Sequence, residues 1–477
     1  MPFYFTSRRR RVGAVLTVAV AATALLTVVM WHGGEAQPFD PLLVELQERT
    51  FRYFWETANP ENGLVPDRFP THSYASIAAV GFGLTTYPIG VERGYITRAQ
   101  ARVRVLTTLR FLARAPQGPE ATGRSGHRGF FYHFLDMQTG VRFDDSELST
   151  VDTALLLAGA LFCQSYFDAA HPEEIEIRRR VEEIYRRVDW RWAQAKAPAI
   201  TLGWSPEEGF LKYDWRGYNE AMLVYLLALA SPTHAVGADA WNEWTSTYDA
   251  QWRKAHGQEL LHFAPLFGHQ YTHVWLDFRD IKDAYMRRRG LDYFENSRRA
   301  VYAQQAYAVS NPRGCKEYSA KIWGISASDG PADVVVEDAA DTREFWTYAA
   351  RGSDPAHDDC TLAPTAAAAS IPFAPEVAIP AVREMHARYG RHIYGEYGFL
   401  DAFNPTFTYD IPLRHGRKVE GFGWVADDYL GIDQGPILTM IENYRSGLVW
   451  RVMRENPHVR RGLTRAGFSG GWLETAK

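Results

Sequence analysis

Carboxylate side chains that stand beside aromatic ones are the residues of this sequence best suited to chemistry. Glu220 follows Tyr218 at the start of an apolar run, and Asp401 lies in a loop rich in glycine and aromatic residues. Glu147 and Asp152 flank a further turn. Two carboxyl groups in different surroundings can act as acid and base, because burial keeps a proton on one while the other stays ionised. The sequence has no HExxH and no P-loop that would indicate other chemistry.

Aromatic residues set the expected substrate class. The 477 residues include 15 Trp, 25 Tyr and 26 Phe. Sugar rings stack their C–H faces on such side chains, and their hydroxyls bond to carboxylates and amides. Two carboxylates then suffice to cleave a glycosidic bond, so we expect a carbohydrate substrate. We expect no cofactor, and no CxxC or His/Cys cluster indicates a metal.

Composition and charge exclude several other classes of protein. With 46% hydrophobic and 23% charged residues, the chain can bury a large core and is not disordered. Without its first 36 residues it holds 48 basic and 55 acidic residues, a net charge of −7. This surface disfavours nucleic acid and other anionic polymers. The expected partner is a neutral glucan polysaccharide or oligosaccharide.

The first 36 residues resemble an export segment and lie outside the expected fold. Four arginines, at positions 8–11, precede an uncharged run from Val12 to Trp31. A small-residue pattern ends at Ala36. Residues 1–36 are therefore a signal peptide, or an N-terminal membrane anchor that spans the bilayer with residues 12–31. We expect a periplasmic or secreted protein that meets a membrane only through such an anchor.

The remaining residues, 37–477, are expected to form one all-α domain. Apolar residues recur at helical spacing, and runs that are apolar on every side alternate with runs that are charged on most faces. Inner helices touched on all sides and outer helices facing water would give this alternation, so we expect a double ring of helices. Predicted helices include 74–84, 149–167, 172–192, 219–229, 238–251, 274–288, 291–310, 342–350, 375–389 and 431–453. Long loops, among them 263–283 and 394–425, are expected to wall a cleft.

The three cysteines have different surroundings. Cys163 lies in an apolar run and is expected to be a buried thiol. If a disulfide forms, we expect Cys315 and Cys360 to be its partners, because both lie in loop-like segments.

Many short segments, in one order from about Phe39 to Phe468, resemble the bacterial glucoamylase-like proteins that include glycoside hydrolase family 144. The resemblance implies an (α/α)6 toroid and an enzyme that cleaves β-1,2-glucan, usually internally, to sophoro-oligosaccharides with inversion at the anomeric carbon. The segments that carry it are Phe134–Met137, Glu147–Leu156, Gly217–Ala221, Pro265–Arg279, Trp323–Gly324, Ser328–Pro331, Ala363–Ala366, Pro372–Glu376, Tyr397–Asn404, Gly431–Ile437 and Ile441–Arg445.

The resemblance favours Glu220 as general acid and Asp401 as general base. A plain first-turn acid and a solvated loop carboxylate are the alternatives for these two positions. Asp433 and Asp152 remain open as bases. An inverting pair that acts directly stands about 6.5 to 9.5 Å apart. Relatives can also relay the proton through a substrate hydroxyl.

Glu147 and Asp152 have structural alternatives of their own. Ser149 and Asp152 fit a capping box before an apolar run, which would account for Asp152 without any catalytic role. Glu147 belongs to an acidic cluster that could bind sugar hydroxyls, take part in catalysis or hold Ca²⁺, although no EF-hand spacing supports a cation.

A further set of polar and aromatic residues is expected to bind substrate. The run 269–279 is too polar for a typical core and is interpreted as a subsite wall, with a buried Asp277–Arg279 ion pair as the alternative. The full set is Asp136, Trp215, Tyr218, His269, Gln270, His273, Trp275, Asp277, Arg279, Trp323, Asp329, Asp433, Gln434 and Arg445.

Three functions therefore compete. The first is an exported β-1,2-glucanase. The second is a helical-toroid exo-glucosidase or an α-glucosidase of the glucoamylase type. The third is a non-catalytic glucan-binding protein.

Overall fold

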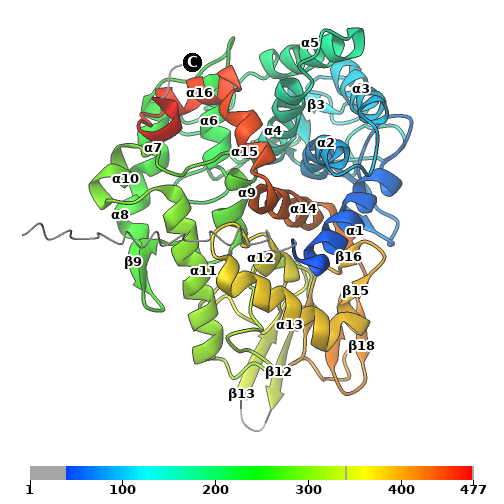
Figure 1. Ribbon diagram of the computed structural model, residues 1–477, viewed down its shortest axis with the longest axis vertical. Helices are drawn as coiled ribbons and strands as arrows, with labels where there is room; N and C mark the ends of the chain where they lie inside the picture. The colour runs from blue at the N-terminus through cyan, green and yellow to red at the C-terminus, as the bar shows by residue number, and fades with distance from the viewer. Residues whose placement is uncertain (1–38, 339–340, 475–477) are drawn as a thin grey trace, which may run out of the picture. The chain divides into compact units, whose positions relative to one another are not determined.

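Two kinds of helix alternate along the chain in the computed structural model, which describes residues 39–338 and 341–474 (Figure 1). Six helices are buried on nearly every face: α2 (Ile77–Glu92), α4 (Thr150–Tyr166), α6 (Met222–Ala230), α9 (Phe267–Trp275), α12 (Pro364–Ala368) and α14 (Gly431–Arg445). Five longer helices bury one side only: α1 (Pro41–Thr57), α3 (Arg98–Arg114), α5 (Pro172–Arg186), α11 (Tyr293–Ser310) and α13 (Pro375–Ile393).

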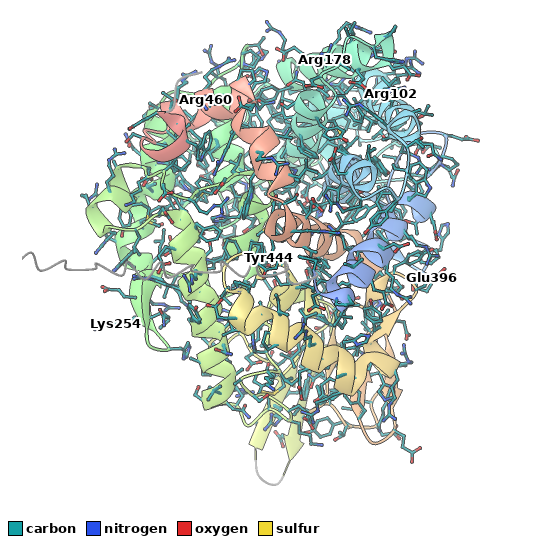
Figure 2. All side chains as sticks on the ribbon, in the orientation of Figure 1. Arg102, Arg178, Lys254, Glu396, Tyr444 and Arg460 are labelled. Carbon is teal, nitrogen blue, oxygen red and sulfur yellow. A yellow bond between two sulfur atoms is a disulfide. The ribbon has the colours of Figure 1, made fainter. Side chains whose placement is uncertain are left out.

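The fully buried helices pack on one another and the others cover them. Helix α2 contacts α4 and α14, α4 contacts α6, and α14 contacts α9 and α12. The outer helices α1, α3, α5 and α13 lie against α14, α2, α4 and α12 respectively. Arg102 on α3 and Arg178 on α5 lie at the outer margin (Figure 2). The expectation of a mainly helical protein is confirmed.

Shorter elements complete the described chain. The remaining helices are α7 (Asp239–Trp244), η1 (Thr245–Thr247), α8 (Tyr248–Gln251), α10 (Ala284–Arg289), α15 (Leu448–Arg454), α16 (Pro457–Arg465) and η2 (Gly471–Leu473). The strands are β1 (Arg68–Phe69), β2 (Ala75–Ser76), β3 (Gly126–His127), β4 (Phe130–Tyr132), β5 (Phe134–Leu135), β6 (Leu148–Ser149), β7 (Gly203–Ser205), β8 (Gly209–Phe210), β9 (Trp252–Ala255), β10 (Gln258–Leu261), β11 (Ala327–Ser328), β12 (Val334–Asp338), β13 (Asp341–Phe345), β14 (Ala349–Ala350), β15 (Tyr394–Gly395), β16 (Gly398–Phe399), β17 (Phe403–Asn404), β18 (Arg417–Val419), β19 (Gly423–Val425) and β20 (Tyr429–Leu430).

Short strands fix the beginnings of three inner helices. Helices α2, α4 and α14 each follow directly on a two-residue strand, β2, β6 and β20. These strands pair with β5, with β4 and β7, and with β1. Ser76 and Ser149 cap α2 and α4 by accepting bonds from the backbone N–H groups of Ala79 and Asp152. Loop residues are thereby held beside the first turns of inner helices.

Three sequence predictions of secondary structure are wrong. The predicted helix 274–288 is interrupted, because residues 276–283 separate α9 from α10. Residues 342–350, predicted as a helix, form most of β13 and the strand β14. The predicted loop 263–283 contains α9, an inner helix. Residues 342–350 are strands because they pair with β12 and β11, and the polar residues of α9 find partners on other inner helices. The local sequence pattern reveals neither kind of contact.

The cysteine predictions are confirmed. Cys315 and Cys360 form a disulfide, and Cys163 is a buried free thiol on α4 whose sulfur contacts the carbonyl of Leu84 on α2. The predicted export segment, residues 1–36, lies outside the described residues. Within the described ranges, no helix has the length and apolarity needed to cross a membrane.

Two glycines allow α2 and α4 to touch backbone to backbone. A Cβ on Gly159 would lie 1.9 Å from the carbonyl oxygen of Gly81, and one on Gly81 would lie 2.4 Å from the carbonyl oxygen of Leu155. Neither backbone atom can move without shifting a whole inner helix. The crossing therefore requires glycine at both positions.

We expect Gly159→Ala to destabilise the protein by about 2 kcal/mol or more, because the new methyl group overlaps the backbone of α2. Gly390→Ala is the matched control: a Cβ there has no neighbour closer than 3.5 Å, so removing a helical glycine should stabilise by roughly 0.5–1 kcal/mol. Chemical unfolding of both variants measures the difference. Equal stabilities would contradict the proposed close crossing.

Candidate active site

A cavity of about 440 Å³ opens where the short strands meet the inner helices. Its lining combines aromatic rings with charged and hydroxyl groups, a mixture that suits a sugar. The lining residues are Asp67, Arg68, Tyr74, Ser76, His133, Phe134, Asp329, Thr347, Tyr348, Arg414, His415, Leu430 and Ile432.

Arg68, on β1, is the cation that holds one side of this cavity together. Its Nη1 lies 2.8 Å from Oδ2 of Asp329, and its Nε lies 3.4 Å from Asp67. Asp428 is a third partner, at 3.7 Å. Burial acts to lower the pKa of Arg68, but the charges of Asp329 and Asp67 outweigh it and raise the pKa, so the group stays charged. Several acids thus share one positive charge.

Asp401 and Asp433 form a buried pair behind this ion-pair group. Oδ2 of Asp401 accepts a 2.7 Å bond from the backbone N–H of Asp329, while its Oδ1 is buried without a protein partner. Burial raises the pKa of Asp401 well above its usual value, and the nearby charge of Asp433 raises it further. Burial also raises the pKa of Asp433, which is hydrogen-bonded to Asp401. The pair therefore retains a proton where isolated aspartates would lose both.

His133 organises the opposite side of the cavity. Its Nδ1 lies 2.9 Å from Glu147, and its Nε2 lies 3.6 Å from Asp152. Burial acts to lower the pKa of His133, but the charge of Asp152 and the bond to Glu147 prevail and raise it to about 9. Ser149 caps α4 by accepting from the N–H of Asp152 and also bonds its carboxylate. Asp152 is thus both a first-turn residue and a partner of His133.

Glu220 stands beside Asp152, just before α6. Asn219 accepts a 3.0 Å bond from the N–H of Ala221, and Thr272 on α9 donates to the carbonyl oxygen of Glu220 at 3.4 Å. Burial raises the pKa of the Glu220 carboxyl group to about 7, and the charge of Asp152 adds to the shift. Its Oε2 is buried and makes no hydrogen bond within the protein. A carboxylic acid in this state can donate a proton at neutral pH.

Tyr271 on α9 links the two groups of acids. Burial raises its pKa well above the usual value, and the charges of Asp433, Glu220 and Asp152 contribute. These three carboxylates therefore lie near one phenol. The sequence prediction did not name Tyr271, Arg68 or His133. An Asp-Arg dipeptide outside any helical period was the only visible signal for Arg68.

The structure places most of the predicted subsite wall at 269–279 inside the protein. Its members belong to α9 and the turn after it, and several of their polar atoms bond to protein groups, whereas Nδ1 of His269 and Nδ1 of His273 have no hydrogen-bond partner among the described residues. Gln270 donates to the carbonyl of Ala366, and Trp275 donates to Thr85. The wall residues His269, Gln270, His273, Trp275 and Asp277 are at most 1% exposed. Asp277 pairs with Arg279 and with Arg454, the structural alternative considered above.

The other predicted binding residues are spread over the molecule. Asp136 is solvated and caps its own turn through Thr139, and Arg445 lies near Phe39 at the far end of α14 from Asp433. Trp215 donates to Thr150, and the buried Tyr218 stacks on Tyr293. Trp323 and Gln434 are buried outside the cavity lining. The residues that the structure brings together are Glu147, Asp152, Glu220, Asp329, Asp401 and Asp433.

Metal binding has little support in the described part of the chain. The one group of potential ligands there is Cys315, Asp358 and Cys360. Both sulfurs of this group are joined in the disulfide, so they cannot act as thiolate ligands.

The sequence profile of the Glycoamylase family, described as "Putative glucoamylase", matches residues 212–457. The chain belongs to this family. The expected resemblance to glucoamylase-like proteins is thereby confirmed.

Solved structures of similar proteins share the fold over nearly all of their length. A "putative glucoamylase" from Bacteroides uniformis is 33% identical with a TM-score of 0.78, covering 91% of this chain and 98% of its own. An endo-β-1,2-glucanase from Chitinophaga pinensis, in complex with sophorotriose and glucose, is 29% identical with a TM-score of 0.77, covering 91% and 99%.

One relative with a curated description acts on oligosaccharides of the β-1,2 linkage. It is an exo β-1,2-glucooligosaccharide sophorohydrolase (non-reducing end) from Parabacteroides distasonis, 30% identical over 456 residues. The match covers 89% of this chain and 57% of that protein's length.

We expect Glu220→Gln to gain stability relative to the wild type as pH rises. The folded-state pKa of about 7 exceeds the ordinary value of 4.5, so folding favours the protonated form. That stability is complete below pH 4.5 and is lost as pH rises through 7. Unfolding free energies at pH 5 and pH 8.5 should show a relative gain of about 1–3 kcal/mol for the variant. Glu61→Gln, at an exposed position, is the control. If the stability difference between Glu220→Gln and the wild type does not change with pH, Glu220 does not hold a buried proton.

Proposed function

We propose that the protein is a glycoside hydrolase that cleaves β-1,2-glucan to sophoro-oligosaccharides, with Glu220 as general acid. The state of Glu220 carries the proposal: its pKa is raised to about 7 and its Oε2 has no partner within the protein. Such a group can protonate a glycosidic oxygen at neutral pH. The relatives named above support β-1,2-glucan as the substrate.

The Asp401–Asp433 pair is proposed as the base. The pair holds one proton in the resting site, and its remaining charge can accept a proton from water or from a substrate hydroxyl. With the proton of the pair on Asp433, Oδ1 of Asp401 is the oxygen available for this step, because Oδ2 is held by the N–H of Asp329. Glu220 and the Asp401–Asp433 pair supply a separate acid and base, as an inverting mechanism requires, so we propose inversion at the anomeric carbon.

Internal cleavage is the mode we propose, by analogy with the Chitinophaga endo-β-1,2-glucanase. Release of sophorose from the non-reducing end is the alternative, and the Parabacteroides sophorohydrolase favours it. Chain-length analysis of early products separates the two, because internal cleavage yields a range of oligosaccharides whereas terminal release yields one disaccharide.

Two finer expectations from the sequence remain part of this proposal. The alternation of buried and half-buried helices supports the (α/α)6 toroid. The basic and apolar composition of residues 1–36 supports export to the periplasm or beyond, with or without an anchor.

We expect the wild type to release reducing ends from linear β-1,2-glucan and to leave starch intact. Glu220→Gln should lower kcat by about 10²–10⁴-fold, because the amide keeps the shape of the side chain but cannot donate the proton. Glu61→Gln should retain full activity. Substantial activity in Glu220→Gln would refute its role as the acid. Binding of unaltered glucan with no hydrolysis by the wild type would instead indicate a binding protein.

We expect a bell-shaped dependence of kcat/KM on pH. Activity should fall above about pH 7 as Glu220 loses its proton, by about tenfold per pH unit. On the acid side it should fall as the Asp401–Asp433 pair takes up a second proton. Initial rates on β-1,2-glucan from pH 4 to pH 9 measure both limbs. A rate that stays constant from pH 6 to pH 9 would contradict an acid of this pKa.

A further inference from the structure

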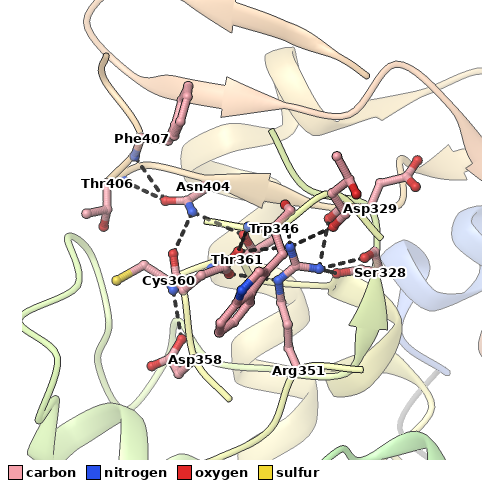
Figure 3. A network of polar contacts seen from close by, with 12 residues as sticks. Ser328, Asp329, Trp346, Arg351, Asp358, Cys360, Thr361, Asn404, Thr406 and Phe407 are labelled. Carbon is pink, nitrogen blue, oxygen red and sulfur yellow. Dashed lines mark hydrogen bonds and ion pairs between the residues drawn. The ribbon is translucent and has the colours of Figure 1, made fainter. Parts of the chain in front are cut away.

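Arg351 is a buried guanidinium that the proposed mechanism does not use. Its side chain is 0% exposed, and Nε and Nη2 form a bidentate pair with Asp359 at 2.7 and 2.9 Å. Asp359 also accepts from the backbone N–H groups of Trp346 and Thr361. Asp359 therefore compensates the charge of Arg351. The other N–H groups of the guanidinium donate to backbone carbonyls (Figure 3).

Those donors tie together two segments that line the cavity. Nη1 donates to the carbonyl of Ser328 at 2.6 Å and reaches that of Asp329 at 3.4 Å. Nη2 donates to the carbonyls of Trp346 and Thr347, both at 2.9 Å. Asp329 and Thr347 are cavity residues. One planar group thus fixes the spacing of two walls, a task for which a lysine has too few donors and the wrong geometry.

The Asp329 segment passes this constraint on to Asp401. The backbone N–H of Asp329 is the donor that holds Oδ2 of Asp401, and the Asp329 carboxylate is held in turn by Arg68. A Cβ at Gly330 would lie 2.1 Å from Nη2 of Arg351, so glycine at this position lets the guanidinium reach the turn. Arg351 and Asp401 are therefore connected through the backbone of residues 328–329.

The segment that carries Asp359 is also held by a disulfide. Cys360, which follows Asp359, is joined to Cys315. Asn404, three residues after Asp401, donates to the carbonyl of Asp359 at 2.9 Å and to Thr361 at 3.1 Å. The loop that carries Asp359 is thus held both by the disulfide and by Asn404, which lies beside Cys360 and Thr361 in Figure 3.

We infer that Arg351 is a positioning residue for the reaction: by clamping the backbone at 328–329 it aims the N–H of Asp329 at Asp401 and so sets where Oδ1 of that carboxylate points. This inference rests on the proposed function in one respect only, the role of Asp401 as part of the base. Arg351 itself touches no substrate, since it is fully buried.

Arg351→Lys tests the inference while it keeps a cation beside Asp359. Asp433, Asp329, Arg68 and Tyr348 also face Asp401, and none of them is altered. The N–H of Asp329 acts to lower the pKa of Asp401, so a loosened segment should let that pKa rise. The acid limb of kcat/KM should then move upward by about half a pH unit or more. We expect kcat to fall about tenfold or more while KM changes less.

Arg187→Lys is the matched control. Arg187 donates to the carbonyls of Leu112 and Ala113, which lie outside the cavity lining. Its variant should lose thermal stability with no change in the pH profile. If Arg351→Lys loses stability in the same way and keeps the wild-type pH profile, Arg351 is merely structural and the inference is overturned.

Hydrogen exchange gives a second readout that needs no activity. Peptides spanning 326–331 should exchange faster in Arg351→Lys than in the wild type, and should be unchanged in Arg187→Lys. Unchanged exchange in Arg351→Lys would overturn the inference. Failure of the wild type to cleave β-1,2-glucan would overturn the proposed function instead, while the exchange experiment would still decide whether Arg351 clamps the segment.

Discussion

The site depends on one electrostatic constraint: it contains more buried acids than positive charges to pair with them. In the described part of the chain, Arg68 and His133 form ion pairs with acids at the cavity, each with at least two carboxylates, and Arg414 also lines the cavity. Ionising every acid in so enclosed a space would cost far more than these pairs return. Glu220 and the Asp401–Asp433 pair therefore keep protons at neutral pH. The same imbalance that would weaken a purely structural core leaves the site with both an acid and a base.

The fold creates this imbalance through the beginnings of its inner helices. Asp152 and Asp433 lie in the first turns of α4 and α14, and Glu220 lies just before α6. Helix N-termini favour negative charge, which offsets part of the cost of collecting acids there. The two-residue strands then bring Arg68 and His133 to the same place. Helices supply the acids, and the connections between them supply the cations.

The sequence predicted the parts of this arrangement that are local. Helical periods gave the mainly helical class, and the acids beside aromatic residues included Glu220, Asp401 and Asp433. Contacts between distant segments left no local trace. Arg68 meets Asp329 across 261 residues of chain, and the polar side chains of α9 find partners on other inner helices. A polar run that looked too hydrophilic for a core is a core helix, because several of its polar groups find partners on other inner helices.

The disulfide also closes a loop whose buried and exposed parts tolerate different amounts of sequence change. Cys315 and Cys360 close a loop that contains the β12–β13 hairpin, whose base is anchored by Phe345 in a small apolar cluster with Phe407 and Trp424. The loop is held at its ends and at the hairpin base, and its strand β12 exposes side chains such as Val335. Substitutions at exposed positions of β12 are therefore tolerated without disturbing the segments that Arg351 holds.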